Sequence, residues 1–231
     1  MPLHLGYSFA TMQMPLVALG AALSLLAAAP LAAADAGGDA HPHHAGAVAT
    51  DDPDSGAELI GRPAPAWSFD RWIRTEPLSL GQLRGKVVLL RWWTQGCHFC
   101  DATLPGLESL RKRHAKDGLV VLGVFHPKPP REVSDRRIVG TAVALGFGGP
   151  LAVDRHWSTL ERYWLGGHPD RNWTSVSFLI DRDGHIRWVH GGGEYHRSND
   201  PRHHRCDLQY QDLERALAEA LASPAAARAG E

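Results

Sequence analysis

The stretch Val87–Cys100 constrains the fold of this chain more than any other part of its sequence. It reads VVLLRWWTQGCHFC, so a β-branched and aromatic run passes through a short polar turn into two cysteines three residues apart. The residues that follow, Asp101–His114, show helical spacing of Leu104, Leu107 and Leu110. A buried strand that leads at once into a Cys-x-x-Cys pair at the start of a helix is typical of a redox site.

The position of the two cysteines has a chemical consequence. Cys97 would lie near the positive end of the helix dipole, which favours the thiolate over the thiol. Cys100 follows one turn later, where it can close a disulfide or resolve a mixed one. A purely structural disulfide would close a very short loop and add little stability, and a zinc site would need two further ligands. The spacing therefore predicts that Cys97 and Cys100 are redox-active.

The composition excludes several classes of protein. The chain has 231 residues, enough for one domain with extensions. Its 24 Lys and Arg nearly balance 25 Asp and Glu, so no basic field indicates a nucleic-acid partner. Three cysteines are too few for a disulfide scaffold.

The N-terminal residues are typical of a targeting signal. Leu16–Ala29 is an apolar run, and Ala32–Ala34 offers a small-residue cleavage site, although no Lys or Arg precedes the run. We predict a signal peptide over residues 1–34, or an uncleaved membrane anchor as the alternative. Both place the rest of the chain in the periplasm or otherwise outside the cytoplasm. Residues 35–57 lack a periodic apolar pattern and predict a disordered linker.

The remaining sequence predicts one α/β domain over residues 58–223 and a frayed tail over 224–231. Strands alternate with helices, which implies a parallel portion, and a hairpin signal at Arg182–Gly184 adds antiparallel strands. The result is a central mixed sheet flanked by helices. The pattern predicts strands at 87–92, 119–125, 151–153, 176–181 and 186–190, helices at 101–114, 131–145 and 208–221, and a helical turn at 157–164.

Roughly residues 60 to 222 resemble the thioredoxin-like superfamily, in particular periplasmic thiol–disulfide oxidoreductases of the TlpA type and the redox domain of DipZ proteins. The resemblance implies a thioredoxin-like fold behind an N-terminal extension. It is carried by Arg91–Cys100 with Leu104-Pro105, by Gly118–Val124, by Trp157 with Tyr163, by Phe178–Arg187 and by Gly192–Tyr195.

The resemblance also implies roles for individual residues. Cys97 would be the attacking nucleophile and Cys100 the resolving thiol. Pro105 matches a proline that bends the active-site helix, and Trp93 matches an aromatic residue that shields the sulfurs. No cofactor is implied beyond the Cys97–Cys100 disulfide. The expected partners are protein thiols or disulfides and a membrane or periplasmic redox donor.

Two positions depart from this family pattern. Ser175, preceded by Thr174, stands where the family places a cis-proline facing the disulfide. A non-proline cis bond costs about 2.5–4 kcal/mol, so we expect a different substrate-docking backbone here. Thr103 stands where TlpA-type reductases often carry an acidic residue. A proton shuttle would then come from elsewhere or be weaker.

The histidine between the two cysteines allows two interpretations. A protonated His98 would stabilise the Cys97 thiolate and raise the oxidising power of the pair. Alternatively, His98 points to solvent beside the motif. Sequence reasoning leaves both open. The more distant His126, His190 and His196 are predicted to be surface or capping residues.

The third cysteine, Cys206, lies next to His203 and His204. It could resolve a Cys97 intermediate, pair with another chain, or join His203 and His204 in a copper or zinc site. The favoured interpretation is an unpaired thiol near the start of the last helix.

The function predicted from the sequence is an extracytoplasmic thiol–disulfide oxidoreductase that acts on protein substrates. One alternative is a peroxiredoxin-like peroxidase, because Thr94-x-x-Cys97 matches the core of that signature, although Leu90 stands where its proline is expected. Another is a thioredoxin-fold metallochaperone for copper or zinc. The physiological direction, reductase or oxidase, stays open.

Overall fold

A computed structural model describes residues 56–224 of the chain. The predicted signal peptide or anchor, nearly all of the predicted linker and the tail after Pro224 lie outside these residues. Of the last two residues of the predicted linker, Gly56 is buried and Ala57 begins a 3₁₀ turn, so ordered structure starts slightly before residue 58. Across the described range, no helix has the length and apolar character needed to cross a membrane.

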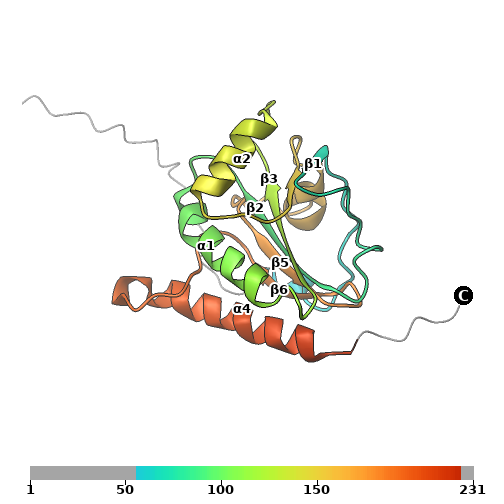
Figure 1. Ribbon diagram of the computed structural model, residues 1–231, viewed down its shortest axis with the longest axis vertical. Coiled ribbons are helices and arrows are strands. Elements are labelled where there is room, and N and C mark those ends of the chain that lie inside the picture. The colour runs from blue at the N-terminus through green and yellow to red at the C-terminus, as the bar shows by residue number, and fades with distance from the viewer. Residues whose placement is uncertain (1–55, 225–231) are drawn as a thin grey trace, which may run out of the picture. The chain divides into compact units, whose positions relative to one another are not determined.

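The described residues form a six-stranded sheet with the strand order β1-β4-β3-β2-β5-β6 (Figure 1). Strand β3 pairs in parallel with both β2 and β4, while β1, β5 and β6 join in antiparallel fashion. The predicted mixed sheet is therefore confirmed. The strands are β1 (Arg71–Ile73), β2 (Val87–Trp93), β3 (Leu119–Phe125), β4 (Leu151–Val153), β5 (Ser177–Ile180) and β6 (Ile186–His190).

Helices cover one face of the sheet, and a shorter helical segment covers the other together with residues 59–80 (Figure 1). Because both faces are covered, all seven residues of β2 are buried. The first face carries α1 (His98–Arg113), α2 (Asp135–Ala144) and α4 (His204–Ala222); the second carries α3 (Ser158–Leu160) and the helical turn η2 (Glu161–Leu165). Two short 3₁₀ turns complete the fold, η1 (Ala57–Leu59) and η3 (Pro201–His203).

Several boundaries differ from the sequence-based expectation. Helix α1 begins at His98 and α4 at His204, both earlier than predicted, whereas α2 begins later, at Asp135. Strand β1 was not predicted at all. It has three residues and pairs only along β4, so its local sequence carries too little periodicity to indicate a strand.

Alternation along β2 divides its side chains between the two layers. Leu89 and Trp93 pack into the cluster beneath α1 and α4, while Leu90 and Trp92 pack into the opposite cluster. By the same alternation, Arg91 points to the α1 and α4 side, although it carries a charge. It is fully buried there.

Candidate active site

The two cysteines lie where strand β2 turns into helix α1. Gly96 adopts a φ of 75° in this turn, a conformation that glycine tolerates well. Cys97 is the N-cap of α1, and the Cys100 N–H donates to its carbonyl oxygen at 2.9 Å. Cys97 is partly exposed and Cys100 is buried; both are free thiols. A substrate can therefore reach the first sulfur while the second stays covered.

Ser175 faces both sulfurs. Its Oγ lies 3.4 Å from Cys97 Sγ and 3.6 Å from Cys100 Sγ. The cis peptide bond of the described residues is Lys128–Pro129, so the bond before Ser175 is trans, as expected for serine. Where the family pattern has a proline ring, this chain presents a hydroxyl that can donate to a thiolate.

The buried Arg91 side chain hydrogen-bonds to the backbone of Ser175 and Gly193. Its Nη1 donates to the carbonyl oxygen of Ser175 at 2.6 Å, and its Nη2 donates to that of Gly193 at 2.9 Å. The guanidinium also lies 5.4 Å from the centroid of the Tyr195 ring. Among residues 56–224, no carboxylate pairs with it. Arg91 is thus a buried cation, and its positive charge favours the thiolate form of Cys97.

These contacts separate the acidities of the two thiols. The pKa of Cys97 is lowered to about 5, first by its hydrogen bond with Cys100 and then by Ser175 and the positive charge of Arg91, with burial opposing. The pKa of Cys100 is raised, first by the same hydrogen bond with Cys97 and then by burial. At neutral pH the site therefore holds a thiolate at Cys97 and a protonated thiol at Cys100.

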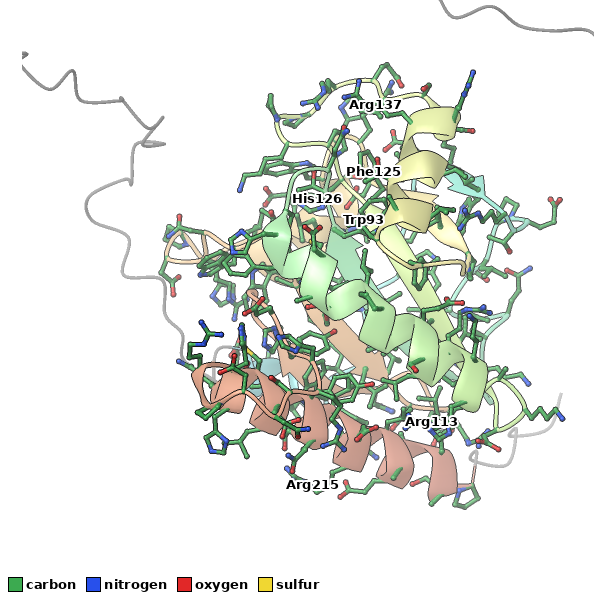
Figure 2. All side chains as sticks on the ribbon, turned by 60° about the vertical axis from the view of Figure 1, so that its left-hand side comes forward. Trp93, Arg113, Phe125, His126, Arg137 and Arg215 are labelled. Carbon is green, nitrogen blue, oxygen red and sulfur yellow. The ribbon has the colours of Figure 1, made fainter. Side chains whose placement is uncertain are left out.

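Trp93 lies in the hydrophobic core at the end of β2. Figure 2 shows it near Phe125 and His126, and its ring centroid is 5.0 Å from that of Phe125. Trp93 belongs to the same packed cluster as Cys100, and Cys97 packs against that cluster. The Trp93 carbonyl oxygen accepts a hydrogen bond of 3.0 Å from His126 Nδ1. Burial lowers the pKa of His126 to about 3, so this imidazole is neutral.

His98 is exposed and lies against Phe99, with ring centroids 3.9 Å apart. Phe99 in turn meets the edge of Trp173 at 5.3 Å. The groups that lower the pKa of Cys97 are Cys100, Ser175 and Arg91, not His98. Of the two interpretations left open above, the exposed position agrees with the solvent-facing one.

Thr103, Pro105 and Thr174 have structural surroundings. The buried Thr103 hydroxyl donates to the Phe99 carbonyl at 2.8 Å and accepts from the Tyr195 N–H at 3.3 Å, which ties α1 to the loop after β6. Pro105 lies inside α1, where it supplies no N–H to the helix. Thr174 is buried next to Ser175.

Helix α1 also carries a buried carboxylate that could serve as a proton shuttle, Glu108, one turn beyond Leu104. Its carboxylate accepts two hydrogen bonds of 2.8 Å from Arg111 and one of 3.2 Å from the Gly148 N–H. The Arg111 hydrogen bonds above all lower its pKa to about 2. Glu108 therefore stays ionised and cannot supply a proton near neutral pH.

The third thiol, Cys206, belongs to a different cluster. Burial and the neighbouring Glu194 carboxylate raise its pKa to about 11. His203 lies beside it, as anticipated, but His204 is exposed and lies outside the cluster. Glu194 and His196 take that place, and sequence reasoning had assigned neither of them to it.

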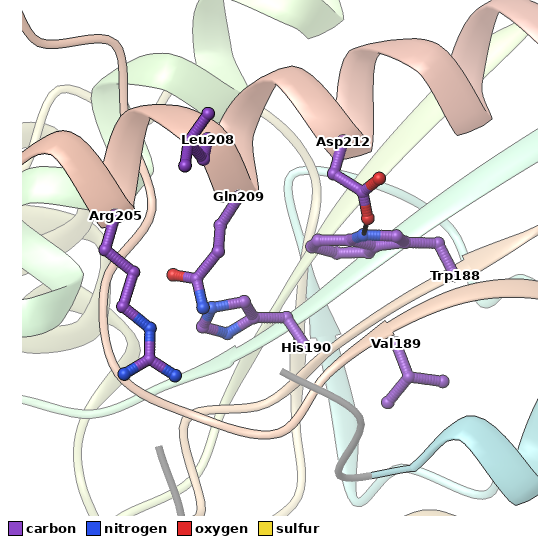
Figure 3. Close-up of a pocket in the computed structure, with 7 residues that line it drawn as sticks. All are labelled: Trp188, Val189, His190, Arg205, Leu208, Gln209 and Asp212. Carbon is purple, nitrogen blue, oxygen red and sulfur yellow. Dashed lines mark hydrogen bonds between the residues drawn. The ribbon is translucent and has the colours of Figure 1, made fainter. Parts of the chain in front are cut away.

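A separate pocket of about 400 Å³ opens between β6 and the first half of α4 (Figure 3). In Figure 3 the side chain of Gln209 reaches over the ring of His190. Burial lowers the pKa of His190 to about 3, so its ring is neutral. None of the cysteines lines this pocket, and it is not part of the thiol site.

At the thiol site, Arg91 is the residue that sequence reasoning missed. The available signal was a lone charged side chain inside an otherwise apolar strand, between Leu90 and Trp92. A charge at such a position is costly unless it is paired or hydrogen-bonded. Its partners come from residues 84 and 102 positions later in the chain, which no local pattern indicates.

Comparison with known proteins identifies the family of this chain. The family model described as "AhpC/TSA family" matches residues 60–189, more than half of the chain. The chain therefore belongs to the AhpC/TSA family.

Among curated relatives, DipZ of Mycobacterium tuberculosis is 31% identical over 128 residues, which are 54% of this chain and 18% of DipZ. FixW of Rhizobium leguminosarum is 25% identical over 140 residues, which are 56% of this chain and 59% of FixW. The thiol-disulfide oxidoreductase ResA of Geobacillus kaustophilus is 28% identical over 133 residues, 58% of this chain and 70% of ResA. The chain thus spans less than two thirds of DipZ and FixW.

Solved structures confirm the thioredoxin-like fold. A thiol-disulfide isomerase from Corynebacterium glutamicum superimposes with a TM-score of 0.52 at 23% identity, covering 69% of this chain and 97% of that one. A thiol:disulfide interchange protein of the thioredoxin family from Chlorobium tepidum gives a TM-score of 0.51 at 20% identity, covering 70% and 97%. At these identities the likeness concerns the fold.

Proposed function

We propose that this protein is a thiol–disulfide oxidoreductase that exchanges disulfides with protein substrates through Cys97 and Cys100. One observation carries the proposal. The partly exposed Cys97 at the start of α1 is held as a thiolate by hydrogen bonds from Cys100 and Ser175 and by the buried Arg91 charge. The names of relatives such as the thiol-disulfide oxidoreductase ResA support it.

The first step follows from this charge distribution. The Cys97 thiolate attacks one sulfur of a substrate disulfide, and a new S–S bond forms between Cys97 and the substrate. The other substrate sulfur leaves as a thiolate and takes up a proton. Because Cys100 is buried and protonated, the incoming disulfide meets a single nucleophile.

The second step is set up by the first. In the mixed disulfide Cys97 carries no negative charge, so the main cause of the raised Cys100 pKa is lost. Arg91 and the Ser175 hydroxyl then favour the Cys100 thiolate. Cys100 attacks Cys97 Sγ, the Cys97–substrate bond breaks, and the substrate leaves reduced by two electrons. The pair is oxidised to a disulfide, and the reverse sequence oxidises a substrate dithiol.

The cycle needs a second thiol or disulfide partner to reset the Cys97–Cys100 pair. We propose a membrane or periplasmic redox protein for this role, with the chain placed outside the cytoplasm. The apolar run Leu16–Ala29 and the small-residue site at Ala32–Ala34 support that location. Only the two sulfurs take part in electron transfer, so no organic cofactor enters the cycle.

Trapping of the intermediate tests the proposal. The Cys100→Ser variant should accumulate a mixed disulfide between Cys97 and an insulin chain when it is mixed with disulfide-bonded insulin. The matched Cys97→Ser variant should accumulate none. Mass spectrometry identifies the linked cysteine. Insulin reduction that persists in Cys97→Ser would contradict the assignment.

The peroxidase alternative gains no support from the geometry. The hydrogen bonds that reach the Cys97 sulfur come from Ser175 and Cys100, and within residues 56–224 none comes from Thr94. We therefore expect hydrogen peroxide to oxidise Cys97 no faster than a simple thiolate of the same pKa, as measured by stopped-flow fluorescence. A markedly faster reaction would favour a peroxidase.

A further inference from the structure

We propose that Glu194, His196, His203 and Cys206 form a binding site for one Zn²⁺ ion. One donor atom from each side chain lies within 4.8 Å of all the others. The site joins the loop after β6 to the start of α4 and uses neither Cys97 nor Cys100. It does not depend on the proposed redox function.

The local structure explains how four ligands meet here. His203 is the N-cap of α4 and Cys206 lies three residues later in its first turn, so the two side chains lie on the same side of the helix start. Glu194 and His196 are two residues apart in the loop that follows β6. A backbone hydrogen bond of 3.2 Å from the His196 N–H to the Cys206 carbonyl holds the loop against the helix.

The distances among three of the four donor atoms are close to those of a tetrahedral zinc site. Zn–N and Zn–O bonds of about 2.0–2.2 Å and a Zn–S bond of about 2.3 Å separate neighbouring ligand atoms by about 3.3–3.6 Å. His203 Nδ1 lies 3.3 Å from Glu194 Oε1, and Cys206 Sγ lies 3.5 Å from the same oxygen. Cys206 Sγ and His203 Nδ1 are 3.9 Å apart. Three of the four ligand atoms therefore need to move by only a few tenths of an ångström.

His196 is prepared as the fourth ligand. Its Nδ1 lies 3.1 Å from the carbonyl oxygen of Arg197. A carbonyl only accepts, so Nδ1 carries a hydrogen, which leaves Nε2 as the ring nitrogen that can offer a lone pair to a metal ion. That Nε2 is buried and has no hydrogen-bond partner. Metal-binding histidines commonly donate their other N–H to a backbone carbonyl in this way.

The chemistry of the set favours zinc. Zn²⁺ takes thiolate, imidazole and carboxylate ligands and prefers four of them in closed structural sites. The carboxylate of Glu194 and a thiolate at Cys206 would repel each other, and a divalent cation between them turns that repulsion into attraction. Four protein ligands leave no position open, so the site would be structural.

The bound ion would stabilise the backbone next to the thiol site. The Gly193 carbonyl accepts from Arg91 at 2.9 Å, and the Tyr195 hydroxyl lies 2.7 Å from Ser177 Oγ. Gly193 and Tyr195 alternate along the chain with the proposed ligands Glu194 and His196. Zinc would thus fix the segment 193–196 that supports Arg91 from one side.

Zinc binding by the full chain tests the proposal in a background free of competing ligands. This background carries Cys97→Ser and Cys100→Ser, and also His41→Ala, His43→Ala and His44→Ala because those side chains could bind metal themselves. The reduced, chelator-treated protein is titrated with Zn²⁺ in competition with a chromophoric chelator. We expect one tight equivalent, and a thiolate-to-metal absorption band when Co²⁺ replaces Zn²⁺.

Single variants in this background assign the ligands. Cys206→Ser should abolish the Co²⁺–thiolate band, and His196→Ala and His203→Ala should each weaken Zn²⁺ binding by at least about tenfold. The exposed neighbour His204→Ala is the matched control and should bind Zn²⁺ unchanged. Circular dichroism shows that each variant is folded before titration.

Three results would overturn the site. One is the absence of a tight equivalent in the folded background protein. Another is a Co²⁺–thiolate band that survives Cys206→Ser, and the third is equal weakening by His204→Ala and His203→Ala. Retention of Cu⁺ with no measurable Zn²⁺ binding would overturn the assignment of the metal.

Discussion

The guanidinium of Arg91 donates a 2.6 Å hydrogen bond to the carbonyl oxygen of Ser175, the residue whose hydroxyl lies 3.4 Å from Cys97 Sγ. A single connected set of contacts thus runs from a buried cation to the reactive sulfur. Removing a cation from water costs several kcal/mol unless it is compensated. A thiolate at Cys97 supplies that compensation, so the contact stabilises the reduced form of the site.

Removing the Ser175 hydroxyl should raise the pKa of Cys97. In the unmodified protein we expect iodoacetamide alkylation of Cys97 to follow a midpoint near pH 5, because the thiolate is the nucleophile. Ser175→Ala removes one hydrogen bond to that thiolate and should move the midpoint up by about one pH unit. Alkylation rates across pH, followed by mass spectrometry, measure it. An unchanged midpoint in Ser175→Ala would assign the low pKa to other groups.

Removing the Arg91 charge should make the site less oxidising. Thioredoxin combines a nucleophile pKa of about 7 with about −270 mV, and DsbA combines about 3.5 with about −120 mV. A Cys97 pKa of about 5 places this protein between them. Arg91→Met destabilises the thiolate and should lower the reduction potential by tens of millivolts.

Equilibration with glutathione redox buffers measures that potential. The matched control is Arg187→Met on the exposed side of β6, which should leave the potential unchanged. Arg91→Lys keeps the charge but cannot bridge two carbonyl oxygens with a planar fork. Its reduction potential should therefore lie between those of Arg91→Met and the unmodified protein. A potential in Arg91→Met equal to or above that of the unmodified protein would contradict the role of Arg91.

The reduced protein should gain stability as pH rises from about 5 to about 8.5. Cys97 has a pKa of about 5 when folded and about 8.5 when unfolded, so the unfolded state binds more protons in this window. The contribution is fully present above the unfolded value and is lost as pH falls through 5. Because Cys97 is partly exposed, we expect only about 1–3 kcal/mol.

Urea unfolding of the reduced protein at several pH values measures this slope. The difference between the unmodified protein and Cys97→Ser isolates the contribution of Cys97 from those of other titrating groups. An identical pH dependence in the two proteins would show that Cys97 has the same pKa folded and unfolded.

Gly123 on β3 should not accept a side chain. A Cβ there would lie 3.0 Å from Leu151 Cδ2, 3.0 Å from Phe147 Cε1 and 3.1 Å from Trp93 Nε1, all inside the packed core. We expect Gly123→Ala to lower the free energy of unfolding by about 1–3 kcal/mol. The control is Gly140→Ala on α2, where nothing lies within 4 Å and the helix should gain up to about 1 kcal/mol. Denaturant unfolding compares the two, and equal effects would contradict the packing argument.

The local sequence was sufficient to predict the central strands and the junction between β2 and α1. Strand β3, strand β4 and strand β6 have the predicted bounds, and β2 and α1 meet at the predicted cysteines. These features depend on contacts between near neighbours, such as apolar spacing, a turn and a helix start, and their periodicity is visible in one stretch of chain. The thioredoxin-like α/β arrangement followed from their order.

Only the tertiary structure decided what surrounds the sulfurs. Arg91 reaches Ser175 and Gly193, and Glu194 and His196 join His203 and Cys206, because sheet pairing and helix packing bring separate segments together. The sequence suggested His204 as a neighbour of Cys206, but the structure brings Glu194 and His196 to Cys206 instead. Adjacency in the sequence therefore did not predict which donor atoms lie close together. Side-chain direction on a helix turn and loop closure against that helix decide which donor atoms meet, and neither is a property of any one segment.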